Sequence, residues 1–304
     1  MIYNGILHHY TSKSNRLAMK TILCITDFSQ CSENAAKYAY ELAQFLNARL
    51  LLFHNISNSA AAVQAPSEDD CHSQLVTQLE DRNGYINKLE AVRRRIAYNS
   101  ANQVSCESLV KHGEAKENIP ALIQEEKVDL VVIGNEAADA LRDIFSGTVA
   151  AHVIEKSTCP VLVVPQQAAF KPFRQIVFAV DKTGEPYQDT GLVHRLVQLF
   201  DAEVHALHVL PKERASASAV AEEEIFPLKA WNTYKLVNYH IILHNSIEQG
   251  ISQFTRERRA DMLVLGYHAE NPWQHLRNVD AFQEKAYHTY LPVLFAHYKR
   301  QNQK

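Results

Sequence analysis

Residues suited to holding an anion stand close together in the first half of this 304-residue chain. Gly147 and Thr148 directly precede a helix-like run that starts around Val149, and Gly134 closes an apolar run before them. Glycine lets the backbone approach a phosphate, a helix N-terminus offers free N–H groups with a favourable dipole, and a hydroxyl adds a donor. The pattern predicts a phosphate site. The alternative is that Gly134 only ends a strand and Thr148 only caps a helix.

Other chemical patterns point away from catalysis and metal binding. The sequence lacks the G-x-S-x-G, P-loop and H-E-x-x-H motifs, so we expect a binding protein with no catalytic residues and no metal site. His205 and His208 are three apart on an expected strand and should face opposite sides of it. His54 and His208 end equivalent strands and are candidates for ligand contact, with structural hydrogen bonding as the alternative.

Composition excludes several classes of protein. Hydrophobic residues make up 46% of the chain, charged residues 21%, and the formal net charge is −3, which is typical of an ordinary globular protein without a basic surface for nucleic acid. The apolar runs are far shorter than the roughly 20 residues of a membrane-spanning helix, so no membrane is expected. Five cysteines without metal spacing, and no signal-peptide pattern, favour free thiols in the cytoplasm.

The elements that must position the phosphate site occur twice. Apolar runs in the first half recur in the second, displaced by 154 positions for the first two runs and by 132 for the last two. The matching pairs are 21–27 with 175–181, 49–54 with 203–208, 128–134 with 260–266, and 159–164 with 291–296. The chain is therefore a tandem repeat. The second copy lacks 22 residues, an interval where the first has a polar stretch and an expected helix from about Leu75 to Tyr98.

Each copy alternates strands and helices. The strands are too continuously apolar for a sheet with one wet face, which favours a parallel sheet covered by helices on both sides. The fold class expected is α/β, two tandem doubly wound, Rossmann-like parallel sheets of five strands. We expect a tail at 1–18, domains at 19–166 and 174–299, and a proline-containing linker at 167–173. Ligands in such sheets bind beyond the carboxyl ends of the strands.

These motifs resemble the universal stress protein family over nearly the whole chain. Its nucleotide-binding members carry G-x2-G-x9-G-(S/T) after the fourth strand. The resemblance implies that this motif holds the phosphates and ribose of ATP, with Mg²⁺ as a possible companion, and that the aspartate ending the first strand lies beside the nucleoside. The matching positions here are Asp27, Gly134, Ala137, Gly147, Thr148 and Val149.

Departures from the motif predict a weakened site in the first copy and none in the second. Ala137 replaces the second glycine, and its methyl group disfavours positive φ at a cost of about 1 kcal/mol if that conformation is needed. Glu136 and Asp139 add negative charge to the same loop. In the second copy Val279 and Asp280 replace Gly147 and Thr148, and a carboxylate at a helix N-terminus repels an anionic ligand.

Two readings of function follow. The first is a stress-response protein that binds an adenine nucleotide or another small molecule. The second is a nucleotide-independent scaffold that acts through second-copy surfaces such as the loop at 267–275. In the family the final strands pair across a dimer, so here 161–164 and 293–296 are expected to pair within one chain, giving a pseudo-dimer that can dimerise again.

Overall fold

The computed structural model describes residues 20–57, 68–98, 104–135, 148–179, 191–210, 237–267 and 291–297, with the backbone alone at 68–80, 148, 191, 267 and 297. The expected tail at 1–18 lies outside these residues. The first half contains β1 (Thr21–Ile25), α2 (Gln30–Leu46), β2 (Arg49–Ile56), α3 (Glu68–Ala97), β3 (Cys106–His112), α4 (Ala115–Glu125), β4 (Leu130–Asn135), α5 (Thr148–Lys156) and β5 (Val161–Pro165). The second contains β6 (Gln175–Ala179), α6 (Gly191–Phe200), β7 (Glu203–Leu210), β8 (Val237–Leu243), α8 (Ile247–Glu257), β9 (Met262–Tyr267) and β10 (Val293–His297).

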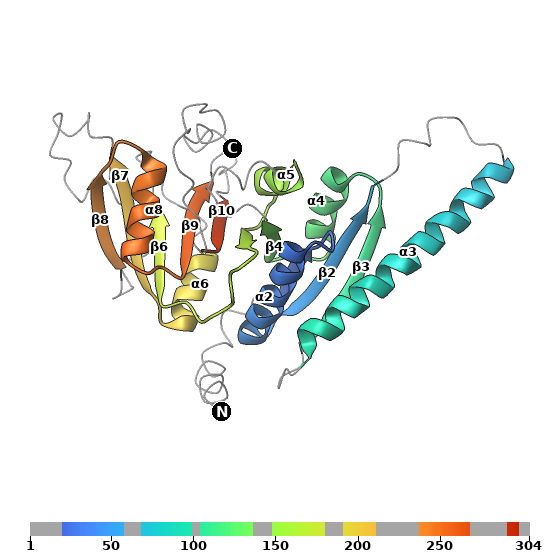
Figure 1. Ribbon diagram of the computed structural model, residues 1–304, viewed down its shortest axis with the longest axis horizontal. Helices are drawn as coiled ribbons and strands as arrows, with labels where there is room; N and C mark the ends of the chain where they lie inside the picture. The colour runs from blue at the N-terminus through green and yellow to red at the C-terminus, as the bar shows by residue number, and fades with distance from the viewer. Residues whose placement is uncertain are drawn as a thin grey trace, which may run out of the picture.

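The ten strands that the structure describes form one sheet (Figure 1), in the order β3-β2-β1-β4-β5-β10-β9-β6-β7-β8. Strands within each half are parallel, and β5 pairs antiparallel with β10 at the centre. The α/β doubly wound class is confirmed, and so is the pairing of the final strands. The two five-stranded units are thus halves of a continuous sheet. In the first half the strand order reverses between β1 and β4, which is where ligands bind in such folds.

The repeat extends to backbone conformation. Among the described residues, five non-glycine residues have positive φ, and four of them form equivalent pairs, Asn47 with Asp201 and Lys127 with Arg259. Lys127 and Arg259 follow the last turns of α4 and α8 in Schellman geometry, because the next amide, of Val128 or Ala260, donates to the carbonyl five residues back. Both halves therefore end these helices in the same way without glycine.

Glycine at such a position is expected to stabilise the protein. Lys127 is exposed at φ 51°, so Lys127→Gly should raise the free energy of unfolding by about 0.5 kcal/mol by removing left-handed strain. Urea unfolding of Lys127→Gly beside Lys127→Ala provides the measurement. The alanine variant loses the same side chain but keeps the strain, and equal stabilisation by both would contradict this explanation.

Helices cover both faces of the sheet. Residues of α2, α3 and α6 pack on one face, and residues of α4, α5 and α8 pack on the other. Phe45 of α2 and Phe200 of α6 lie 5.7 Å apart between ring centroids, and Phe170 and Phe173 of the connecting segment pack against Phe200. The Asn34 side chain also donates to the carbonyls of Pro165 and Ala168. The connection is thus part of the core between the halves.

The helix α3 is longer than the sequence pattern indicated. It begins at Glu68, about two turns before the expected start near Leu75. The added residues open with an acidic run, Glu-Asp-Asp, which the positive end of the helix dipole favours although it carries no apolar periodicity. In Figure 1 the amino-terminal part of α3 projects well beyond the sheet. The interval between β7 and β8, 211–236, lies outside the described residues.

Candidate functional site

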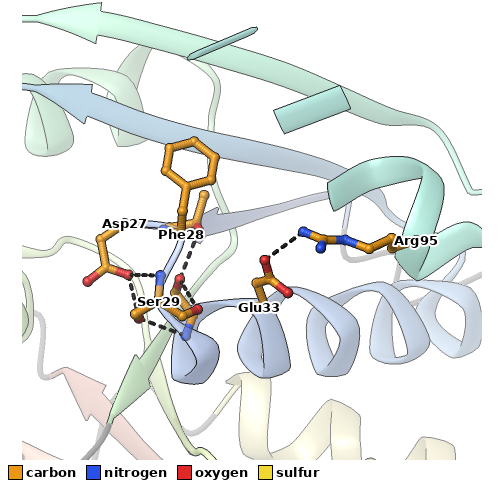
Figure 2. Close-up of polar contacts among 7 residues, drawn as sticks. Asp27, Phe28, Ser29, Glu33 and Arg95 are labelled. Carbon is orange, nitrogen blue, oxygen red and sulfur yellow. Dashed lines mark hydrogen bonds and ion pairs between the residues drawn. The ribbon is translucent and has the colours of Figure 1, made fainter. Parts of the chain in front are cut away.

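Asp27 lies at the carboxyl end of β1, in the turn that leads into α2. Its carboxylate accepts hydrogen bonds from the Ser29 amide at 2.9 Å and the Ser29 hydroxyl at 2.6 Å, as Figure 2 shows. Burial alone would raise the pKa of Asp27, but these bonds and the nearby Ser32 hydroxyl hold it below its ordinary value. Ser29 also caps α2 by accepting from the Ser32 amide. The turn therefore presents an oriented, ionised carboxylate.

Phe28, the next residue, adopts a left-handed conformation with φ 66°. Bulky residues seldom do so, because the β-carbon crowds the backbone. The Phe28 amide donates to Thr26 Oγ1 at 3.0 Å, and Thr26 and Ser32 hydroxyls lie 2.9 Å apart. In Figure 2 the Phe28 ring and the Asp27 carboxylate point in different directions. With Phe28 in this left-handed conformation, the short turn directs the Phe28 ring and the Asp27 carboxylate away from each other.

The Phe28 ring belongs to an aromatic cluster with His54 and Tyr85. Ring centroids are 4.6 Å apart for Phe28 and His54, 4.5 Å for His54 and Tyr85, and 5.9 Å for Phe28 and Tyr85. The Lys88 ammonium lies 4.7 Å from the Tyr85 centroid, a cation–π distance. The sequence does not reveal the roles of Phe28 and Tyr85. Tyr85 lies on α3, far from Phe28 along the chain, so no local pattern connects the two residues.

His54 is tied to the scaffold at the end of β2. Its Nδ1 lies 2.8 Å from the carbonyl oxygen of Thr26, and a carbonyl only accepts, so Nδ1 carries the hydrogen. Burial lowers the pKa of His54 despite this bond, so the ring is neutral near pH 7. This hydrogen bond gives His54 a structural role, which was the alternative to ligand contact. His208, its equivalent on β7, is buried.

Gly134 is required for packing between β4 and α2. A β-carbon at this position would lie 2.6 Å from the carbonyl carbon and oxygen of Cys31 and 2.8 Å from the Ser32 amide nitrogen. These are backbone atoms at the start of a helix and cannot move aside singly. The glycine therefore lets α2 approach the sheet, and this role stands whether or not a ligand binds nearby.

The structure brings part of the expected site together. Ile25 of β1 pairs with Ile133 of β4, so Asp27, shortly after β1, and Gly134, near the end of β4, lie at the carboxyl ends of adjacent parallel strands. Helix α5 begins at Thr148, and Val149 in its first turn is 39% exposed. Ala137 and Gly147 lie outside the described residues, as do Glu136, Asp139, Val279, Asp280 and most of the loop at 267–275.

This edge can bind through hydrogen bonds and ring contacts. Asp27 supplies an acceptor for hydroxyl or amino groups, and a helix N-terminus such as that of α5 favours an anion. Over the described ranges, no group of three or more His, Cys, Asp or Glu side chains has the geometry to hold a metal ion. No described helix combines the length and apolar character needed to cross a bilayer.

Comparisons with known proteins agree on one family. The model of the universal stress protein family matches residues 19–165 and 172–279. Universal stress protein MJ0531 of Methanocaldococcus jannaschii is 31% identical over 151 residues, which cover 48% of this chain and 81% of that protein. Universal stress protein MJ0577 of the same organism is 25% identical over 160 residues, covering 49% and 96%. Both span one copy of the repeat rather than two.

A solved structure matches the whole arrangement. The crystal structure of a universal stress protein from Archaeoglobus fulgidus covers 92% of this chain and 98% of its own, with a TM-score of 0.60 and 16% sequence identity. At that identity the likeness concerns the fold alone. It extends over both halves, so the tandem arrangement has a counterpart of known structure.

Proposed function

The chain belongs to the universal stress protein family, in two tandem copies, and from this premise we propose that its first half is a weak binding site for an adenine nucleotide such as ATP. The observation that carries the proposal is the convergence of Asp27 and Gly134 at the carboxyl edge of adjacent strands, the position where the motif resemblance puts the ligand. The proposed set is Asp27, Gly134, Ala137, Gly147, Thr148 and Val149.

The described residues fit a nucleoside better than a phosphate at the Asp27 end. An ionised carboxylate accepts hydrogen bonds from ribose hydroxyls or an exocyclic amine and repels phosphate oxygens. Hydrogen bonds from Ser29 already orient Asp27. The phosphates then belong with the glycine pair and the start of α5, where free amides and the helix dipole favour anions.

The same chemistry argues that binding is weak and confined to one half. Ala137 restricts the loop, and Glu136 and Asp139 oppose the phosphate charge. Mg²⁺, bound with ATP, would offset part of that repulsion. In the second half Val279 and Asp280 remove the cradle. No candidate general base accompanies the motif, so the proposal is a binding protein rather than an enzyme. Dimerisation of the whole chain and a cytoplasmic location stay predictions.

Calorimetric titration of the full chain with Mg-ATP tests this proposal. Gly147→Val should weaken binding at least tenfold, about 1.4 kcal/mol, because the side chain fills the space that the phosphates need. Val279→Ala, at the equivalent position of the second half, is the matched control and should bind like the unaltered protein. Native mass spectrometry of the purified protein identifies any retained small molecule.

Three outcomes are distinct. Binding that Gly147→Val abolishes supports the proposal, and binding that both variants reduce alike places the ligand elsewhere. An absence of heat at millimolar Mg-ATP contradicts the nucleotide-binding proposal and favours the nucleotide-independent scaffold.

A further inference from the structure

A chain of hydrogen-bonded side chains crosses three strands at the amino ends of β6, β7 and β8. His205 Nδ1 lies 3.1 Å from His240 Nε2, and His205 Nε2 lies 2.6 Å from Gln175 Oε1. The Gln175 amide donates to Glu203 Oε2 at 3.0 Å, and the Asn238 amide donates to the other oxygen of Glu203. His205 is 2% exposed. The network therefore links the edge strand β8 to the interior of the sheet.

The network has one consistent direction. Gln175 uses its amide hydrogens on the Glu203 carboxylate, so its oxygen faces His205 and accepts from Nε2–H. A neutral His205 then has an accepting Nδ1, and His240 must donate to it from Nε2–H. When both rings are neutral, every donor in this network finds an acceptor. One added proton can be accommodated if His240 changes to its Nδ1–H tautomer and accepts from His205 Nδ1–H, whereas protonation of both rings puts two N–H groups opposite each other.

The fold does not require histidines at these positions. Equivalent residues in the first half are Leu51 for His205 and Leu109 for His240, by the strand registers Phe53 with Leu109 and Leu207 with His240. Leu51 is fully buried and Leu109 packs against the same core cluster. The second half thus replaces an apolar contact by a polar pair that can take up protons.

Charged groups around the pair are few. Glu203 of β7 has a carboxylate oxygen 3.9 Å from His205 Nε2. On α8, the Phe254 ring lies 4.8 Å from the His240 ring, and the Arg258 guanidinium lies 5.2 Å from the Phe254 ring. From β6 and β8 the neighbours are the neutral amides of Gln175 and Asn238. The positive charge of Arg258 and the negative charge of Glu203 therefore act on the histidine pair from different parts of the fold.

Burial lowers the pKa of His205 and of His240, and Arg258 lowers both further, whereas Glu203 acts in the opposite direction. An unfolded chain binds protons at these rings near the ordinary histidine pKa of about 6.5. Between that value and the lower folded value the unfolded state holds more protons, so stability falls as pH falls through this window. Above it the pair is neutral in both states and the network is complete.

We propose that His205 and His240 form a pH-dependent latch that fastens the edge strand β8 to β7 near neutral pH and releases it in mildly acidic solution. Protonation of both rings points the N–H groups of His205 and His240 at each other, so that this side-chain hydrogen bond between β7 and β8 is lost, and it puts two cations beside Arg258. The effect is local because, within the part of the chain that the structure describes, β8 pairs with one strand, β7. This inference does not depend on nucleotide binding.

Hydrogen exchange of the full chain tests the latch, with protection corrected for the intrinsic effect of pH. From pH 7.5 to 5.5, protection of the β8 amides should fall about tenfold while protection of β2 changes little. The double variant His205→Leu with His240→Leu, which transplants the first-half pair, should show less than a twofold change. His194→Asn, a histidine of α6 outside the network, is the control and should behave like the unaltered protein.

Two results would overturn the latch. One is the same pH-dependent loss of β8 protection in the double-leucine variant. The other is a ring ¹⁵N spectrum at pH 7.5 in which His205 is charged or carries its hydrogen on Nδ1. If the double variant does not fold, His240→Gln replaces it, because an amide donates to His205 Nδ1 without titrating. Its β8 protection should vary with pH at most a third as much as that of the unaltered protein.

Discussion

Gly134→Ala is expected to lower the free energy of unfolding by about 3 kcal/mol, at the upper end of the cost of overpacking. The added methyl group would meet the carbonyl of Cys31 and the amide of Ser32, all backbone atoms of the first turn of α2. Helix α2 must then move away from β4 and lose contacts along its buried face, which includes Ala35 and Leu42. Urea unfolding followed by circular dichroism measures the change.

Gly84→Ala is the matched control and should change stability in the other direction. Gly84 lies inside α3, and a β-carbon there would have no heavy atom within 4 Å. Alanine in a helix interior is favoured over glycine by about 0.8–1 kcal/mol. A neutral result for Gly134→Ala would show that α2 can shift freely, and the packing role assigned to Gly134 would be wrong.

Asp261→Ala should destabilise the protein by about 2–4 kcal/mol, because two backbone amides lose their acceptor in a buried place. The Asp261 carboxylate accepts from the amides of Arg174 at 2.7 Å and Gln175 at 2.9 Å, and Lys171 lies 2.6 Å from its other oxygen. Its side chain is 6% exposed. The carboxylate therefore holds the start of β6 beside β9.

The repeat offers an internal comparison for this prediction. Asp129 accepts from the amides of Lys20 and Thr21 in the same way, but at a more exposed site, so Asp129→Ala should cost about 1–2 kcal/mol. Asp261→Asn keeps one acceptor oxygen and should fall between the unaltered protein and Asp261→Ala. Unfolding transitions in urea rank the variants. An Asp261→Ala protein as stable as the unaltered chain would contradict the assignment.

The sequence predicts the fold well because apolar runs and their spacing determine which segments become strands. Both displacements, 154 and 132, recur in the strand register and in the left-handed residues after the helices. The sequence pattern predicts too late a start for α3, because the residues at 68–74 show no apolar periodicity. The acidic residues at that end fit the positive end of the helix dipole.

The site was less predictable from the sequence. Asp27 and Gly134 are read from the ends of their strands, and the structure puts both at one edge. The packing role of Gly134 depends on how closely α2 approaches β4, which no local pattern encodes. Phe28 gives no sign of its positive φ, since left-handed positions usually attract glycine or asparagine. The contact between His205 and His240 depends on how β7 pairs with β8 and on the rotamers of both side chains.

The antiparallel junction of β5 and β10 joins two copies that share one backbone. Its strands meet at an effective concentration set by the connecting segment, so dilution cannot separate them and a free single-copy relative competes poorly for either partner. Two identical subunits must change together when their gene mutates, whereas two fused copies accumulate substitutions independently. Covalent fusion thus allows one copy to carry a glycine–threonine pair while the other carries valine and aspartate at the equivalent positions.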